Sequence, residues 1–213
     1  MKNRIFALIT ALFISAGISR ADVIDWGFEI IQTPTSSFDS AGVALDSSYT
    51  FYLGGFDDFL PSATRANYSD WISHWSTLDS TTFDDGANNW FTGSSNITDN
   101  LTFDAGDHAY IWGTNGALGD ANAEVILLTS VNWLYPSAQP TDPDVSEFLL
   151  SDVNLTAVIG AVNSNYTGQE SGISNNLGSF DIQTEAVPEP GGVILLGFGL
   201  TCLLFRRKTR QPA

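Results

Sequence analysis

Side chains that could do chemistry are few in this chain, and most of them are carboxylates. Several aspartates stand close together in turns that contain glycine, and oxygen-rich turns of this kind are what Ca²⁺ prefers. Three such groups are present: Asp57 with Asp58, Asp84 with Asp85, and Asp104 with Asp107. None has the spacing of a helix-loop-helix calcium motif, and exposed turn acids usually cap backbone amides instead. One structural Ca²⁺ site and plain backbone capping are therefore both open.

Catalytic signatures are missing from the sequence. The two histidines, His74 and His108, lack metal-ligand spacing, because a zinc site needs three or four ligands. No nucleophile-elbow motif occurs, and the glycines at 113, 116 and 119 do not match a phosphate-binding loop. A glycosidase needs two carboxylates at a fixed separation, and the sequence does not single out such a pair. We therefore predict a non-catalytic protein with no cofactor except a possible structural Ca²⁺.

Tryptophan is the other conspicuous residue type. Six tryptophans lie in the middle of the chain, and exposed aromatic rings are the surfaces on which sugars stack. Trp71 and Trp75 are expected in the core. Trp90 and Trp133, which lie beside polar or proline-rich loops, are expected to be exposed and to form a sugar-stacking surface. A carbohydrate-binding module or secreted glycan hydrolase is therefore the alternative to a structural protein.

Charge separates the middle of the chain from its ends. Residues 22–186 contain 23 acids and one base, Arg65, so their formal charge is −22. Such a surface repels phosphate backbones, which excludes nucleic-acid binding. It could attract divalent cations or cationic polymers. The only cysteine is Cys202, near the C-terminus, so residues 22–186 contain no disulfide.

Residues 1–21 have the pattern of a secretory signal peptide. Lys2 and Arg4 precede an apolar run over residues 5–18, and small residues at positions 19 and 21 form a cleavage site before Asp22. A membrane anchor would need about 20 apolar residues, which is longer than this run. We expect the chain to be exported.

The C-terminal tail, residues 187–213, has three parts. Pro188, Glu189 and Pro190 are followed by an apolar run over residues 191–205, and residues 206–213 are basic. The apolar run predicts a short transmembrane helix that needs local thinning of the bilayer. The basic end is expected to stay cytoplasmic, which leaves residues 22–186 outside. Its charged residues are Arg206, Arg207, Lys208 and Arg210.

These three parts, in this order, resemble the PEP-CTERM sorting signal of exported proteins from Gram-negative bacteria that make exopolysaccharide. The resemblance covers residues 187–210, about a tenth of the chain. It implies that an exosortase, a membrane protease-transpeptidase, recognises Pro188, Glu189 and Pro190 and processes the tail. It also implies delivery to the cell surface or extracellular matrix, with exopolysaccharide as a further partner. The alternative is an ordinary proline-rich linker before a permanent anchor.

Residues 22–186 predict one mainly β domain, an antiparallel β-sandwich or jelly-roll-like fold, because short β-branched and aromatic runs alternate with turn residues. The expected strands are 26–31, 48–53, 90–92, 100–103, 109–113, 125–130, 155–162 and 179–184. One amphipathic helix is expected over about residues 67–78, where large apolar residues recur at helical spacing. Its apolar stripe consists of Tyr68, Trp71, Ile72, Trp75 and Leu78.

Overall fold

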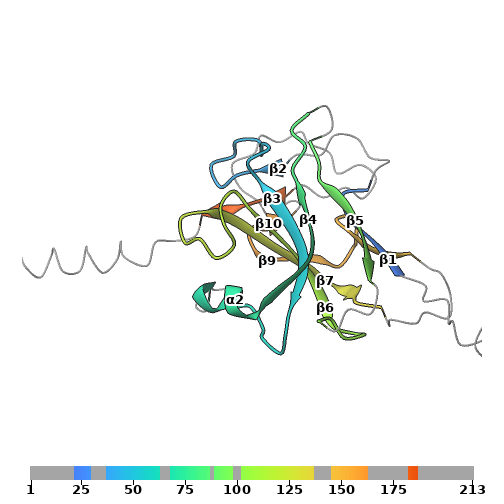
Figure 1. Ribbon diagram of the computed structural model, residues 1–213. Helices are drawn as coiled ribbons and strands as arrows, with labels where there is room; N and C mark the ends of the chain where they lie inside the picture. Colours follow the sequence, from blue (N-terminus) through green and yellow to red (C-terminus); the bar gives the residue numbers. More distant parts are fainter. Residues whose placement is uncertain are drawn as a thin grey trace, which may run out of the picture.

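A computed structural model describes residues 22–29, 37–62, 68–86, 89–97, 102–136, 145–162 and 182–186. The predicted signal peptide and sorting tail lie outside the described residues. Within those ranges the chain is mainly β, as predicted, with a single seven-residue helix (Figure 1). No helix in the described part is long and apolar enough to cross a membrane.

The described part of the domain contains three sheets. The six-stranded sheet has the order β12 (Glu185–Ala186), β7 (Glu124–Leu134), β6 (His108–Thr114), β3 (Thr50–Phe56) and β4 (Trp75–Thr82), and β9 (Leu155–Ile159) also pairs with β7. A second sheet has the order β5 (Thr92–Ile97), β1 (Asp22–Gly27) and β8 (Ser146–Leu149). The third has the order β10 (Ala161–Val162), β11 (Ile182–Gln183) and β2 (Ser37–Phe38). Two of the pairings, β1 with β8 and β2 with β11, are parallel, so the predicted antiparallel arrangement is wrong for these two pairs.

The six-stranded sheet is apolar on both faces. Successive side chains of a strand point to opposite faces, and in β6 Ala109 and Ile111 belong to one buried cluster while Tyr110 and Trp112 belong to the other. Strand β7 divides in the same way, with Ile126 and Leu128 on the first face and Val125 and Leu127 on the second. Each face therefore needs a covering layer.

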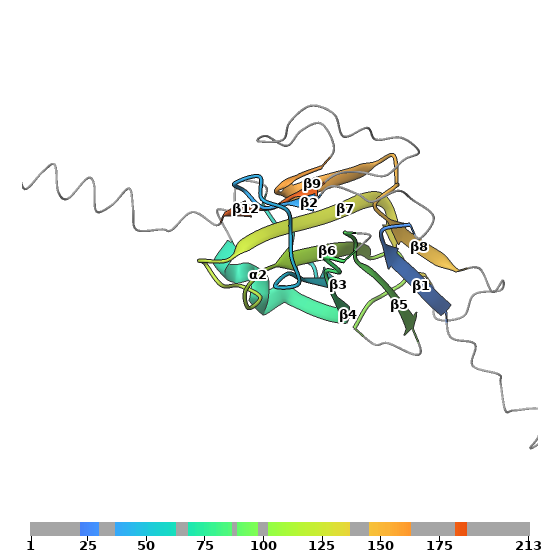
Figure 2. The same ribbon diagram turned by 90° about the horizontal axis from the view of Figure 1, so that it is seen from above.

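The first face is covered by the smaller sheets and the second by helix α2 (Tyr68–His74). In both ribbon views α2 and the β5–β1–β8 sheet lie on opposite sides of the molecule (Figures 1 and 2). Trp71 of α2 is fully buried, and its ring meets that of Trp112 edge-on at a centroid distance of 5.6 Å. The prediction that Trp71 lies in the core is confirmed, whereas Trp75, predicted there too, is only partly buried and belongs to strand β4 (Trp75–Thr82).

The helix is shorter than predicted. It ends at His74, and residues 75–82, which continue the apolar stripe through Trp75 and Leu78, form strand β4. This segment is rich in Ser and Thr, and it pairs with β3 from Phe56↔Trp75 to Thr50↔Thr82. Backbone pairing along a whole neighbouring strand outweighs the helical spacing of two apolar side chains, since intrinsic helix propensity is only a weak preference.

Some of the predicted strands match the structure and others differ from it. Those at 48–53, 109–113 and 125–130 correspond to β3, β6 and β7, and the one at 155–162 is divided into β9 and β10 at Gly160, whose φ is 82°. Others are displaced: β1 ends at Gly27, and β5 begins only at Thr92. Of the strand predicted at 179–184, only residues 182–184 are described, and they include β11 (Ile182–Gln183). Phe103, expected in a strand, lies in a turn, and strands β2, β4, β8 and β12 were not predicted.

One side chain joins the second sheet to the first. Trp26 of β1 is fully buried, and its indole Nε1 donates a 2.9 Å hydrogen bond to Asp79 of β4. The indole lies directly over Gly93 of β5, where an added Cβ would be 2.3 Å from Nε1. Glycine at this position lets the backbone of β5 approach the ring closely.

We therefore expect Gly93→Ala to destabilise the domain by about 2 kcal/mol, because the added methyl forces the Trp26 ring from its buried position. Urea denaturation measures the change. The neighbouring variant Ser94→Ala alters an exposed side chain of the same strand and should leave the midpoint nearly unchanged. Equal midpoints for the two variants would contradict the close packing of Trp26.

Candidate functional site

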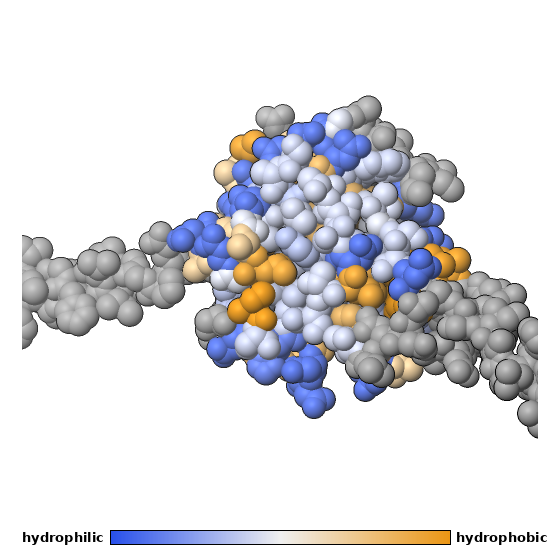
Figure 3. Space-filling view, viewed as in Figure 1, coloured by the Kyte–Doolittle hydropathy of each residue, from blue (hydrophilic) through white to orange (hydrophobic). Residues whose placement is uncertain are grey.

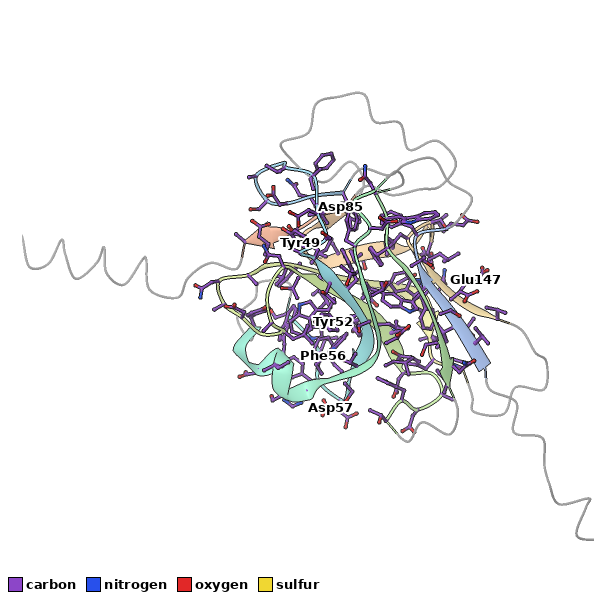
Figure 4. The ribbon with its side chains drawn as sticks, turned by 45° about the horizontal axis from the view of Figure 1, so that its top comes forward. Tyr49, Tyr52, Phe56, Asp57, Asp85 and Glu147 are labelled. Carbon is purple, nitrogen blue, oxygen red and sulfur yellow. The ribbon has the colours of Figure 1, made fainter. Side chains whose placement is uncertain are left out.

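A surface hollow of about 240 Å³ lies where the end of β3 meets the start of β6. Antiparallel pairing of these strands, with Gly54 opposite Tyr110, brings together two segments that are far apart in the sequence. The hollow is lined by residues 56–60 and by Gly106, Asp107, His108 and Tyr110. Figure 4 shows Phe56 and Asp57 at this end of β3, with Tyr49 toward the other end.

Two aromatic rings form the inner part of the hollow. Phe56 and Tyr110 are each 7% exposed, and their rings meet edge-on at a centroid distance of 5.2 Å. Burial raises the pKa of Tyr110. No described residue hydrogen-bonds to its hydroxyl group, so a polar atom in a largely buried side chain faces the hollow without a partner.

The loop after β3 forms the acidic side of the hollow. Asp57 accepts hydrogen bonds from the backbone N–H of Phe59 at 3.1 Å and pairs with Nδ1 of His74 at 3.0 Å. The ring of His74 stacks on Phe59 at a centroid distance of 4.4 Å. The end of α2 thus holds this loop in place. The neighbouring Asp58 is exposed, and its carboxylate has no partner among the described residues.

The predicted Ca²⁺ ligands mainly cap backbone amides. Asp84 accepts from the N–H of Gly86 at 3.0 Å, Asp85 from that of Ser47 at 3.3 Å, and Asp107 from that of Asp104 at 2.9 Å. Within the described ranges, no group of three or more His, Cys, Asp or Glu side chains could hold a metal ion. With Asp57, four of the six candidate acids thus cap backbone amides, which is one of the two alternatives from the sequence.

The predicted sugar-stacking pair does not form one exposed surface. Trp133 is 0% exposed and packs in the first core cluster, 6.0 Å from the ring of Phe148, so its predicted exposure is wrong. The reason is that β7 continues to Leu134 and keeps Trp133 on a buried face. Trp90 is partly buried against the same cluster and exchanges backbone hydrogen bonds with Asp84.

The residues of the hollow were only partly visible in the sequence. Asp57, Asp58 and Asp107 were singled out there, but as members of two separate turns. Phe56, His108 and Tyr110 were not nominated as site residues, because only the β3–β6 pairing brings them to the acids. The one local signal is the run Phe56-Asp57-Asp58-Phe59, in which aromatic rings flank two carboxylates.

At the other end of β3, a carboxylate secures the C-terminal strands of the domain. Glu124, at the start of β7, accepts hydrogen bonds from the backbone N–H of Ser40 at 2.8 Å, from its hydroxyl, and from the hydroxyl of Thr184 at 2.6 Å. Burial opposes ionisation of Glu124, but the hydrogen bonds from Ser40 and Thr184 outweigh it and lower the pKa. Nearby, burial raises the pKa of Tyr49 to about 12.

Comparison with known proteins identifies the segment that follows strand β12. Residues 186–208 match the PEP-CTERM protein-sorting motif, as the sequence predicted. The match begins at Ala186, the last residue of β12. No curated protein and no solved structure matches the chain. The functional assignment therefore depends on the tail and on the geometry of the domain.

Glu124→Gln should lower the free energy of unfolding at pH 7 by about 1 kcal/mol, since the group is only partly buried. The folded-state pKa of Glu124 lies below its ordinary value of 4.5. Its ionised form therefore stabilises the fold fully above that pH, and the contribution is lost as the pH falls through the folded-state pKa. The difference between variant and wild type should shrink as the pH falls below 4.5 and through the lowered pKa of Glu124.

Urea denaturation at several pH values measures this difference. Glu147→Gln, which changes an exposed glutamate of β8, is the control and should show no such trend. A difference between Glu124→Gln and wild type that is the same at neutral and acidic pH would contradict the anchoring role of the ionised carboxylate.

Proposed function

We propose that this protein is an exported cell-surface or extracellular-matrix protein that is anchored in the membrane only until an exosortase-like enzyme processes its tail. The observation that carries the proposal is the sorting motif at residues 186–208, which begins at the residue where the last described strand ends. In this proposal the domain is the cargo and the tail is the sorting signal.

The chemistry of the tail supports recognition in an extended form. Pro188 and Pro190 lack backbone N–H donors and disfavour helix on either side of Glu189. The membrane helix would therefore begin near Gly191 and end at the basic residues 206–210. Glu189 would then lie at the outer surface of the membrane, within reach of a membrane-embedded protease.

The domain supports this arrangement because its C-terminal strands are fixed. Strand β12 pairs with Val125 and Glu124 of β7, and Thr184 is bonded to Glu124. Only Val187 separates β12 from the Pro-Glu-Pro segment. The enzyme would thus meet a short segment between a folded domain and the membrane, with little room for cleavage elsewhere.

For the domain itself we infer a structural or binding role rather than a catalytic one. The support comes from what its polar side chains do: Asp39, Asp46, Asp120 and Asp152 each accept hydrogen bonds from nearby backbone N–H groups in turns. Polar side chains used in this way hold loops and do not activate a substrate. A secreted glycan hydrolase remains the alternative activity, which turnover of a polysaccharide by the purified protein would reveal.

Glu189→Gln should cause the protein to accumulate in the membrane fraction, because it removes the charged residue of the sorting motif. Cell fractionation and immunoblotting measure the distribution between membrane, surface and medium. Glu185→Gln is the matched control, since it removes the same charge four residues earlier. It should be distributed like the wild type.

The same fractionation in cells without the exosortase-like enzyme should also leave wild-type protein in the membrane. Surface delivery that is equal in cells with and without the enzyme would overturn the proposal. So would an identical distribution of Glu189→Gln and wild type.

A further inference from the structure

We propose that the hollow between β3 and β6 binds a cationic amino-sugar unit, one whose ring carries a protonated primary amine. This site goes beyond the proposed sorting of the protein and does not depend on tail processing. The size of the hollow, its apolar lining, the hydroxyl of Tyr110 and the surrounding negative charge all suit such a ligand.

The size of the hollow suits one sugar ring. At about 240 Å³ it is smaller than the 300–1,000 Å³ of sites for drug-sized ligands. It is open to the surface, so a single residue of a longer chain could enter while its neighbours stay outside. On the face shown in Figure 3, apolar side chains form small separate areas between polar ones.

The apolar lining suits the C–H face of a sugar. Phe56 and Phe59 contribute aromatic surface, and Leu60, 77% exposed, lies beside them. The ring of Phe59 stacks on the ring of His74, which fixes its position. The ring therefore needs no ordering when a ligand packs against it, which reduces the entropic cost of binding.

The hydroxyl of Tyr110 adds a hydrogen-bonding group to this apolar lining. Tyr110 is only 7% exposed and lines the hollow. Its hydroxyl has no hydrogen-bond partner among the described residues. The hydroxyl is not among the buried side-chain atoms that lack a hydrogen-bond partner, so it is open to solvent in the hollow and can form a hydrogen bond with a ligand there. A hydroxyl or amine of a bound sugar would supply the missing partner.

Charge selects which sugar fits. Asp57, Asp58 and Asp107 are exposed around the hollow, and the carboxylate of Asp58 is free to accept hydrogen bonds. Residues 22–186 carry a formal charge of −22, so the surrounding field concentrates cations and repels uronic acids and phosphorylated sugars. A protonated amine gives Asp58 a charge-assisted hydrogen bond, which is about twice as strong as a neutral one.

Isothermal titration calorimetry of the full-length protein in detergent tests the site. The probes are a tetramer of glucosamine and the tetramer of N-acetylglucosamine, which has the same rings without the charge. We expect binding of the first and none of the second. Asp58→Asn should weaken binding of the glucosamine tetramer about tenfold, as expected for one lost charge-assisted hydrogen bond.

Two further variants separate the hollow from general charge attraction. Glu147→Gln removes one negative charge on β8, far from Asp57 in Figure 4, and should not change affinity. Tyr110→Phe keeps the ring beside Phe56 and should weaken binding several-fold with an unchanged melting temperature. Equal loss in Asp58→Asn and Glu147→Gln would overturn the site, as would equal binding of the two tetramers or binding of neither. Each of these results leaves the proposed sorting untouched.

Discussion

Strands β6 and β7 are apolar on both faces, and this constraint determines how the remaining elements are arranged. Burying one large apolar side chain contributes about 1.5–3 kcal/mol, and each face of these strands carries several. One face holds Ile111, Ile126 and Leu128, and the other holds Trp112 and Leu127. If one face of the sheet were exposed to solvent, all the apolar side chains on that face would be exposed with it. The small sheets and helix α2 are the layers that prevent this.

The candidate site lies where the layer that covers the second face of the sheet ends. Helix α2 has only seven residues, and it shields Trp112 through Trp71. Beyond its end the apolar face continues to Phe56 and Tyr110, at the point where β3 ends and β6 begins. The loop after β3, pinned by the contact between Asp57 and His74, closes this region only in part. The hollow is therefore the place where the second apolar cluster reaches the surface beside the exposed carboxylates of Asp57, Asp58 and Asp107.

The sequence predicted those features that depend on local pattern. The apolar runs of β6 and β7 identified central strands, the spacing of Tyr68 and Trp71 identified a helix, and the three-part tail identified the sorting motif. The end of the helix was not predictable, because pairing with β3 decides that Trp75 lies in a strand. The burial of Trp133 likewise depends on which face of β7 it occupies. The hollow combines residues 56–60 with 106–110, and only strand register brings them together.

The boundary between domain and tail is central to the account, since Glu124 fixes Thr184 in the domain and the sorting motif begins at Ala186. The most direct measurement is the C-terminal residue of the protein recovered from the cell surface, determined by intact mass and peptide mapping. The account predicts that residues 22–186 are complete and that residues 191–213 are missing. Surface protein that retains residues 191–213 would contradict it.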